Sequence, residues 1–249
     1  MARPPGRAGS GCQASYADSA SLTEQLAAGR FTDQTVGSIH GVATHPDARR
    51  RGRFRRLMEE ALRYCASCYE TLILTTEHPE YFEPFGFRVV KEHLFTVKCD
   101  SAGGGDGFRL LDTRQASDLA LLHRLLEARQ AVSQAVGIVN EKAVFCFNEG
   151  SRPLHYAADL DVIVCWELEE RRLKLFDIVG PKIPPLARVL ERIPQRLDEV
   201  AICFSADQLA VEAEATPYVL DHDGPSYLMV RGPFAAEGQT FTLPRSART

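Results

Sequence analysis

The sequence predicts a mixed α/β fold with two successive lobes, each built on a central mixed β-sheet flanked by helices. Three observations support this prediction. An apolar stretch, a glycine-containing turn, an amphipathic helix and a β-branched stretch follow one another between residues 38 and 76. A glycine-rich segment, residues 101–107, then interrupts the chain. After it, the order of strand, helix, strands, helix, strand and hairpin begins again.

The best-defined element of the first lobe is a helix over residues 53–68. Its apolar residues recur at helical spacing and form one continuous face: Phe54, Leu57, Met58, Ala61, Leu62 and Cys65. Strands are expected on either side of this helix because the flanking stretches are apolar and bounded by turn residues. The other expected elements of this lobe are strands at 38–44 and 71–76, a short helical segment at 80–85, and paired strands at 87–90 and 94–98.

The predicted domain boundaries follow from changes in composition. Residues 1–37 are expected to form a partly disordered lead-in, with one short helix at Ser21–Ala28 and a truncated start of the first lobe. The first lobe occupies residues 38–100, the linker 101–107, the second lobe 108–234 and a weakly patterned tail 235–249. The expected elements of the second lobe are strands at 108–111, 154–168, 173–179 and 199–204, helices at 117–129 and 185–193, and a hairpin at 217–230.

Composition excludes several classes of protein. The chain has 249 residues, a formal net charge of −4 and 45% hydrophobic residues, which argues against a general nucleic-acid binder. From the residue pattern we expect neither a segment that crosses a bilayer nor a secretory signal. The seven cysteines are scattered through apolar stretches, which favours a reducing cytoplasm. The Cys65–Cys68 pair has no partner motif to complete a zinc site, so we interpret it as packing and expect no metal.

An arginine-rich turn at the start of the predicted helix indicates an anion site. Six arginines lie between Arg49 and Arg56, and Gly52 falls among them. The first turn of a helix leaves backbone N–H groups unpaired and carries positive partial charge, so phosphate is a natural ligand there. A glycine lets the phosphate approach the backbone, and arginines add charge-assisted hydrogen bonds. The alternative is a solvated basic face or a nucleic-acid patch.

The stretch from Val42 to Phe54 resembles the acetyl-coenzyme A loop of the GCN5-related N-acetyltransferase (GNAT) superfamily. Its signature is Arg/Gln-x-x-Gly-x-Gly/Ala, which Arg49 and Gly52 match and from which Phe54 departs. The segment Glu80–Phe87 resembles a second landmark of that family, an aromatic segment that ends in Gly-Phe. The resemblance implies acetyl-coenzyme A as co-substrate and a degenerate second lobe. The residues that it implies for coenzyme binding are Val42, Ala43, Thr44, Arg49, Arg50, Arg51, Gly52, Arg53, Phe54 and Arg55.

The resemblance further implies direct attack of an amine on the thioester, which needs a base, donors for the oxyanion and an acid for the thiolate. The donors would be backbone N–H groups of the strand at 38–44. The family's acid position is occupied by Phe82, so its neighbour Tyr81 is the candidate acid, with water as the alternative. His40 is the candidate base on the central strand. Further candidates for the base are His45, Glu77 and His78.

The acceptor stays open between a small-molecule amine and a protein amino group, and the assembly between a monomer and a homodimer. No nucleic acid or membrane partner is expected. The alternative function is a non-catalytic acyl-coenzyme A-binding or regulatory protein, favoured by Phe82 and by the 37 residues before the central strand, fewer than the family usually has. Trp166, followed by Glu167, Glu169 and Glu170, fits either an acidic cleft for a cationic amine or a core residue beside solvated glutamates. Arg129, His155 and Asp177 receive no assigned role.

Overall fold

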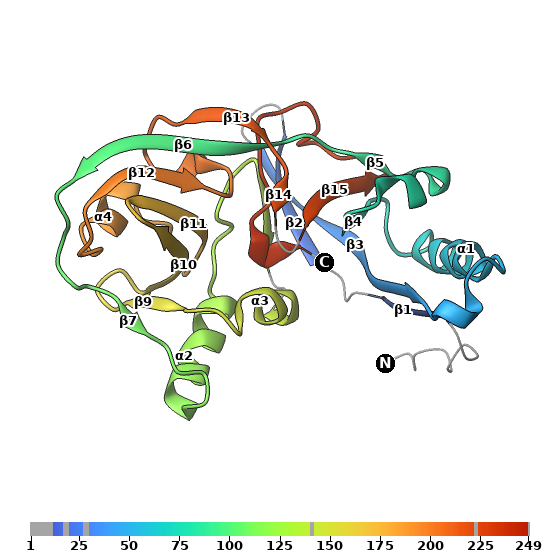
Figure 1. The fold of residues 1–249 in the computed structure, drawn as a ribbon, viewed down its shortest axis with the longest axis horizontal. Coiled ribbons are helices and arrows are strands. Elements are labelled where there is room, and N and C mark those ends of the chain that lie inside the picture. Colours follow the sequence, from blue (N-terminus) through green and yellow to red (C-terminus); the bar gives the residue numbers. More distant parts are fainter. Residues whose placement is uncertain (1–11, 17–19, 27–29, 140–141, 222–223, 249) are drawn as a thin grey trace.

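Two mixed β-sheets lie side by side in the computed structural model, which describes residues 12–16, 20–26, 30–139, 142–221 and 224–248 (Figure 1). The first sheet contains β1 (Cys12–Tyr16), β2 (Ala20–Leu26), β3 (Arg30–Thr44), β4 (Leu72–Thr76), β5 (Arg88–Val89), β8 (Val136–Val139), β14 (Leu220–Asp221) and β15 (Pro225–Arg231). The second contains β6 (Glu92–Ser101), β7 (Arg109–Leu110), β9 (His155–Ala157), β10 (Val162–Glu169), β11 (Arg172–Val179), β12 (Leu197–Ile202) and β13 (Glu214–Tyr218). This architecture confirms the predicted fold class.

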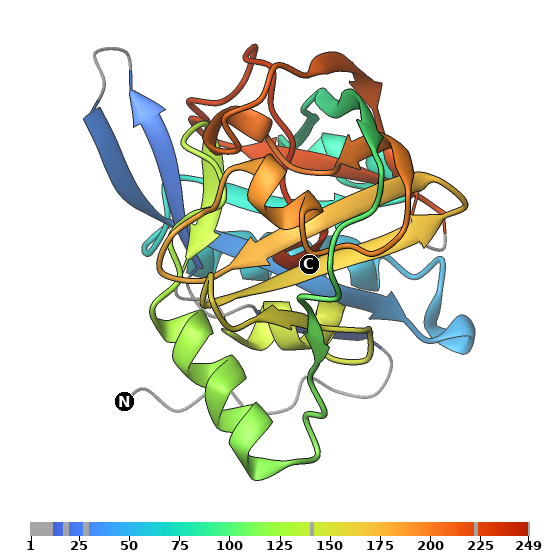
Figure 2. The ribbon, with the colours of Figure 1, turned by 90° about the vertical axis from the view of Figure 1, so that its left-hand side faces the viewer.

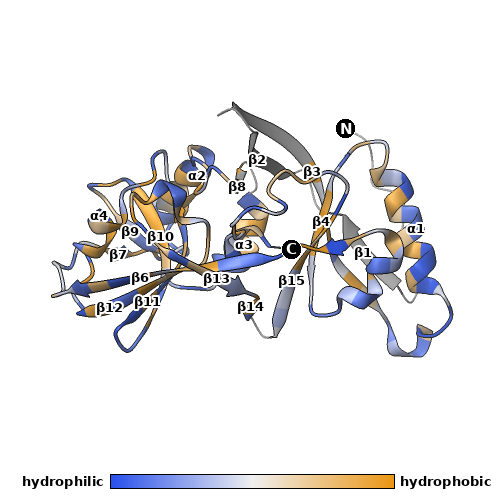
Figure 3. Ribbon diagram, turned by 90° about the horizontal axis from the view of Figure 1, so that it is seen from above, coloured by the Kyte–Doolittle hydropathy of each residue, from blue (hydrophilic) through white to orange (hydrophobic). Residues whose placement is uncertain are grey.

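Helices pack against the sheets, and short 3₁₀ segments lie in the loops and in the C-terminal segment. The helices are α1 (Arg53–Cys65), α2 (Ala116–Glu127), α3 (Lys142–Glu149) and α4 (Leu186–Leu190). The 3₁₀ segments are η1 (Pro46–Ala48), η2 (Pro79–Tyr81), η3 (Glu83–Phe85), η4 (Ala206–Gln208) and η5 (Arg245–Ala247). Figure 2 shows α2 on the outside of the second sheet, and Figure 3 shows the mostly apolar β4 and β10 inside. None of the helices in the described ranges is long and apolar enough to cross a membrane.

The predicted helix of the first lobe is confirmed as α1, which packs on one face of the first sheet. Met58 and Cys65 of α1 join a buried cluster with Ile39, Leu72 and Leu74 of β3 and β4. Burial raises the pKa of the Cys65 thiol, as expected for a cysteine that packs as a small apolar side chain.

The opposite face of the first sheet is covered by the C-terminal segment. Val36 of β3 and Ile73 of β4 pack there against Phe241, Leu243 and Ala247. Residues 241–248 are all buried, and in Figure 1 the C-terminus lies between the two sheets. The weakly patterned tail expected at 235–249 is therefore an interior part of the fold over these residues.

The two sheets exchange strands. β6 leaves the first half of the chain and lies between β12 and β13 in the second sheet. In return, β15 from the second half lies between β4 and β5 in the first sheet. The predicted pairing of residues 87–90 with 94–98 is therefore wrong, because these segments belong to different sheets. The predicted division of the chain at residues 101–107 does not coincide with the division of the strands between the two sheets.

The glycine-rich segment packs closely against the end of α4. The amide of Gly104 donates to the carbonyl of Ile193 at 2.7 Å, and that of Gly105 donates to Glu191 at 3.1 Å. A Cβ on Gly104 would lie 1.9 Å from the Glu191 carbonyl oxygen. These glycines therefore permit a close backbone contact, rather than serving as a spacer between the lobes.

The predicted helix at Ser21–Ala28 is also wrong, because residues 20–26 form β2, which pairs with β3 and β8. Residues 12–16 form β1, which pairs with the other end of β3. The part of the lead-in that the structure describes thus supplies two strands to the first sheet. The remaining residues of 1–29 lie outside the described ranges.

Candidate active site

The candidate site begins where β3 and β4 part. Among the described residues these two parallel strands pair at two positions, Gly37 with Leu72 and Ser38 with Ile73. Beyond Ser38, β3 pairs along its other edge with β1, as far as Thr44 opposite Cys12. Two parallel strands that pair at one end and diverge at the other leave a wedge between them. We call this opening between residues 39–44 and β4 the wedge.

Two glycines shape β3, one on each side of the point where β3 and β4 part. A Cβ on Gly37 would lie 2.6 Å from Cδ2 of Leu72 and 2.8 Å from the Tyr69 ring, so glycine allows the close approach at which the strands meet. Gly41 has a φ of 64°, and the register with β1 shifts at this point. Such a bulge inserts a residue and redirects the backbone groups that follow it. Those groups belong to the predicted oxyanion donors, Val42, Ala43 and Thr44.

The arginine-rich turn closes the end of β3 and opens α1. Nε of Arg49 donates to the carbonyl of Thr44 at 3.2 Å, which ties the turn to the strand. Gly52 is the N-cap residue of α1, with a φ of 71°, and as a glycine it has no side chain with which to cap the first turn. Apart from Gly52, its chain neighbours and the backbone of the helix itself, no heavy atom of the described residues lies within 4 Å of the position that a Cβ of Gly52 would take. The helix start therefore faces open space, as an anion site requires.

The arginines of this turn lie mostly in solvent. Arg53 is half-buried, and the exposed ones are Arg49, Arg50, Arg51, Arg55 and Arg56. Arg50 has a φ of 59°, which is uncommon for a residue with a side chain. The Arg55 guanidinium lies 5.7 Å from the centre of the Phe85 ring, so it joins the turn to η3. Positive charge thus gathers at the end of the wedge where the helix starts.

Phe54, which departs from the family signature, belongs to an aromatic cluster. Its ring lies edge-on to Phe82 at 5.8 Å and to Phe85 at 5.6 Å, and Phe82 in turn meets Phe87 at 6.3 Å. The large side chain therefore fills the space between α1 and the Gly-Phe segment. Phe82, at the family's acid position, is 7% exposed and is part of this core.

Tyr81 points elsewhere. Its side chain is 55% exposed, and its ring lies 5.1 Å from that of His78. His78 also approaches Glu80, with Nδ1 at 3.2 Å from the carboxylate. The structure therefore places the candidate acid in an exposed group after β4, rather than in a closed pocket. The sulfur of a thioester would therefore have to reach Tyr81 at an exposed position.

His40 projects from the face of the sheet that is opposite α1. Its neighbour Ile39 is buried against α1, and successive side chains of a strand alternate between faces. Val36 and His40 are four residues apart, and Val36 faces the C-terminal segment. His45, another candidate base, instead caps η1, and its Nδ1 accepts from the amide of Asp47 at 3.4 Å.

The charged candidates of the second half have structural partners. Glu167 pairs with Arg152 at 3.2 Å and with Arg245 at 3.0 Å, so it does not line an open acidic cleft. The Trp166 ring stacks on His155 with 4.0 Å between ring centres. The remaining contacts are buried pairs of Arg129 with Asp177 at 3.0 Å and of Asp177 with Ser246.

Sequence reasoning missed a set of buried ion pairs that involve the C-terminal segment. Arg245 donates to Glu149 at 2.8 Å and 2.9 Å, and its guanidinium lies 3.5 Å from the centre of the Phe176 ring. Arg248 donates to Glu92 at 2.7 Å. The partners lie about a hundred residues or more apart in sequence, so no local pattern could have indicated them.

Comparison with known proteins relates the first part of the chain to a known family. Residues 17–90 match the acetyltransferase (GNAT) domain family, and this segment contains every predicted site residue. A GCN5-related N-acetyltransferase from Kribbella flavida has a similar fold, with a TM-score of 0.51 and 17% identity over 89% of this chain and 57% of that one. A probable N-acyltransferase of unknown function from Enterococcus faecalis V583 also has a TM-score of 0.51, with 13% identity over 89% and 58%.

No curated protein matches the sequence. The chain spans less than two thirds of the length of either solved structure. The family match confirms the resemblance of residues 17–90 to the GNAT family, and the two solved structures share the fold.

Proposed function

We propose that this chain is an N-acetyltransferase that moves an acetyl group from acetyl-coenzyme A to an amine. The observation that carries the proposal is the wedge between β3 and β4, which ends at a glycine-capped, arginine-rich helix start. A long thioester with a pyrophosphate at one end suits this arrangement. The pyrophosphate would contact the amides and arginines of the turn from Arg49 to Arg55. The cysteines Cys65, Cys165 and Cys203 are free thiols, in keeping with a reducing cytoplasm.

The residues of the wedge supply the groups that the reaction needs. Backbone N–H groups among Val42, Ala43 and Thr44 would bind the carbonyl oxygen of the acetyl group, whose negative charge grows as the amine nitrogen attacks. His40 would take the ammonium proton from the face opposite α1. When the carbon–sulfur bond breaks, the thiolate would take a proton from the exposed Tyr81. The acceptor is a small-molecule amine or a protein amino group.

Binding and turnover are tested separately. Calorimetry should show one acetyl-coenzyme A bound per chain, and reactions with a panel of amines should release free thiol faster than reactions without amine. Arg51→Glu should weaken coenzyme binding, because it reverses a charge at the start of α1. Arg63→Glu is the matched control, since it lies in the last turn, roughly 15 to 18 Å further along the helix. If both variants bind acetyl-coenzyme A equally well, the pyrophosphate does not bind at the start of α1.

The burial of Phe82 at the family's acid position favours a second function, a non-catalytic acyl-coenzyme A-binding protein. The same pair of measurements separates the two. Coenzyme binding without amine-dependent thiol release from any member of the panel would support the second function, whereas amine-dependent release would exclude it.

A further inference from the structure

A cavity of ≈ 380 Å³ lies where the two exchanged strands cross the edge of the first sheet. One wall is residues 89–93, which lead from β5 into β6. The opposite wall is residues 217–219, which lead from β13 into β14, and residues 226–228 of β15 line the remaining side. A cavity of this size suits a small molecule.

Backbone pairs hold these walls in place. The amide of Val90 donates to the carbonyl of Leu228 at 3.0 Å, which fixes the first wall to β15. Glu92 lies opposite Tyr218 in the pairing of β6 with β13, which fixes the two walls to each other. Regular strand contacts therefore shape the cavity, so it exists before any ligand binds.

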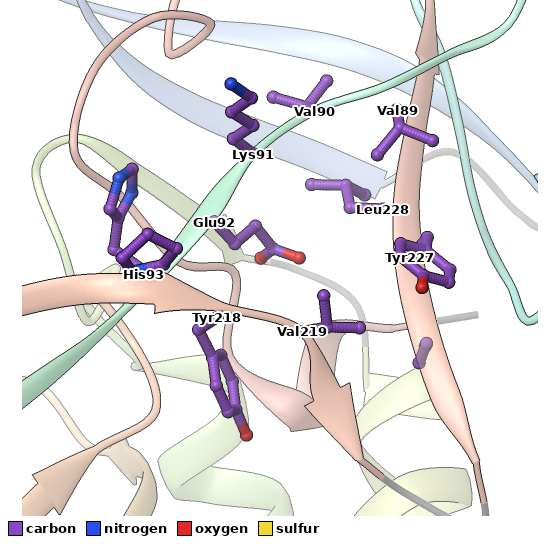
Figure 4. A pocket seen from close by; sticks show the side chains of 11 residues that line it. Val89, Val90, Lys91, Glu92, His93, Tyr218, Val219, Tyr227 and Leu228 are labelled. Atoms are coloured by element: carbon purple, nitrogen blue, oxygen red, sulfur yellow. The ribbon is translucent and has the colours of Figure 1, made fainter.

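Glu92 places a carboxylate in this cavity. The residue is 4% exposed, and Figure 4 shows its carboxylate directed into the space between Val219 and Leu228. Oε1 accepts from the amide of Leu243 at 2.9 Å and from Arg248 at 2.7 Å. Both of these bonds use the same oxygen, so the carboxylate is held in one orientation while Oε2 stays available to a ligand.

The other groups around the cavity are mainly apolar. Val89, Val90, Val219 and Leu228 supply aliphatic surface. In Figure 4 the amine end of Lys91 points away from the carboxylate. The Tyr218 hydroxyl is engaged with Cys203, and burial raises the pKa of this tyrosine, so it stays neutral.

Apolar walls around one oriented carboxylate are complementary to an amine with a hydrocarbon body. An ammonium group would contact Oε2 of Glu92 directly, whereas the Arg248 guanidinium binds the other oxygen, Oε1. The ammonium would therefore lie closer to the carboxylate than to the guanidinium, and the closer of two charges interacts more strongly. The Tyr227 ring adds an aromatic face, which attracts cations.

We propose that this cavity binds a small primary amine, with its ammonium group on Glu92 and its hydrocarbon part against Val89, Val219 and Leu228. The site is separate from the wedge. β15 and β4 lie between them, with Tyr227 paired to Thr76, so the two sites are at least two strand spacings, about 10 Å, apart. The inference thus goes beyond the proposed acetyl transfer, because an amine held here does not reach the thioester.

The test uses three probes of similar shape: phenethylamine, 2-phenylethanol and 3-phenylpropanoate. Calorimetry with the full chain should show the amine binding at least about tenfold more tightly than the neutral alcohol, and the carboxylate more weakly still. A tenfold ratio corresponds to about 1.4 kcal/mol, close to the lower end of the range of about 1.5–3 kcal/mol for a hydrogen bond to a charged group. Equal affinities, or no measurable binding of the amine, would overturn the proposal.

The variants are chosen at the rim so that the protein still folds. Glu92→Gln also removes the partner of buried Arg248, so Val219→Trp, at a side chain that is 41% exposed, is the better test. It should lower phenethylamine affinity at least about tenfold by filling the cavity, without changing acetyl-coenzyme A affinity. Leu110→Trp, at an exposed site on β7, is the control and should change neither. If Val219→Trp leaves amine binding unchanged, the cavity is not the site. If the unmodified chain does not bind acetyl-coenzyme A, that result counts against the proposed acetyl transfer alone and not against the amine site.

Discussion

The start of α1 offers a direct test of where the pyrophosphate binds. Gly52 has left-handed backbone angles, φ 71° and ψ 7°, and open space where its Cβ would lie. Asparagine and aspartate adopt this conformation more readily than other residues with a side chain. Gly52→Asn and Gly52→Asp should therefore each keep the helix start, at a cost of about 1 kcal/mol or less in the free energy of unfolding.

The two variants have the same shape and differ by one negative charge. A unit charge about 5 Å from another one interacts by about 0.8 kcal/mol in water and by about 3 kcal/mol at a protein surface of lower effective dielectric. Gly52 is exposed, so the lower value applies. Two phosphate charges then give about 1.6 kcal/mol, and Gly52→Asp should bind acetyl-coenzyme A about 15-fold more weakly than Gly52→Asn.

Calorimetry at low salt measures this ratio, and urea unfolding checks that the two variants are equally stable. At about 1 M salt the Debye length falls to about 3 Å, so most of the difference should vanish. If Gly52→Asn and Gly52→Asp bind equally well at low salt, no phosphate lies near Gly52 and the assignment of the turn fails. If both variants lose the same affinity for acetyl-coenzyme A and salt does not change that loss, the effect is steric instead.

Three further predictions follow from contacts in the structure. Tyr81→Phe should lower kcat about 100-fold or more and leave coenzyme affinity unchanged, as loss of a general acid requires; unchanged thiol release rules Tyr81 out. Burial lowers the pKa of His155 in the folded protein. As the pH drops below about 6.5, the unfolded chain therefore binds a proton at this histidine before the folded chain does. The free energy of unfolding should then fall by at most about 1.4 kcal/mol per pH unit. Urea unfolding followed by Trp166 fluorescence should show this slope reduced in His155→Phe, and an unaltered slope would contradict it. Arg245→Met should lower the free energy of unfolding by about 3–5 kcal/mol, because it leaves the buried Glu149 carboxylate unpaired. Adding Glu149→Leu should restore much of that free energy. If the losses of the two single variants simply add in the double variant, the two residues are not coupled.

The parts of the fold that the sequence predicted are those with strong local patterns. The spacing of the apolar residues from Phe54 to Cys65 fits only a helix, and the β-branched stretch after it predicts a strand. The helix expected at Ser21–Ala28 has no such local pattern, since Leu22 and Leu26, which are four residues apart, are its main apolar pair. That spacing places two side chains on one face of a helix and also on one face of a strand. Pairing with β3 and β8 selects the strand.

Long-range contacts account for most of what the sequence could not predict. Arg245 and Arg248 look like surface residues in a weakly patterned tail, and they are buried because Glu149 and Glu92 meet them across the fold. The candidate site shows the same division. Its arginine-rich turn follows from a local motif, whereas the exposure of Tyr81 depends on how Phe82 packs against α1.

The exchange of strands makes each half of the chain depend on the other. Without the second half, β4 would lose its partner β15 along all five residues from Leu72 to Thr76. Without the first half, β12 and β13 would lose β6, which lies between them. Unpaired edges of buried strands are costly and promote aggregation.

We therefore expect fragments 1–107 and 108–249 to be insoluble or unfolded when expressed separately, and to form a soluble complex when co-expressed. Circular dichroism and gel filtration would follow folding, and calorimetry would show whether the complex binds acetyl-coenzyme A as the intact chain does. If fragment 1–107 folds alone and binds the coenzyme with unchanged affinity, β15 is dispensable. The wedge would then belong to an independent lobe, and the strand exchange would serve only to join the two sheets.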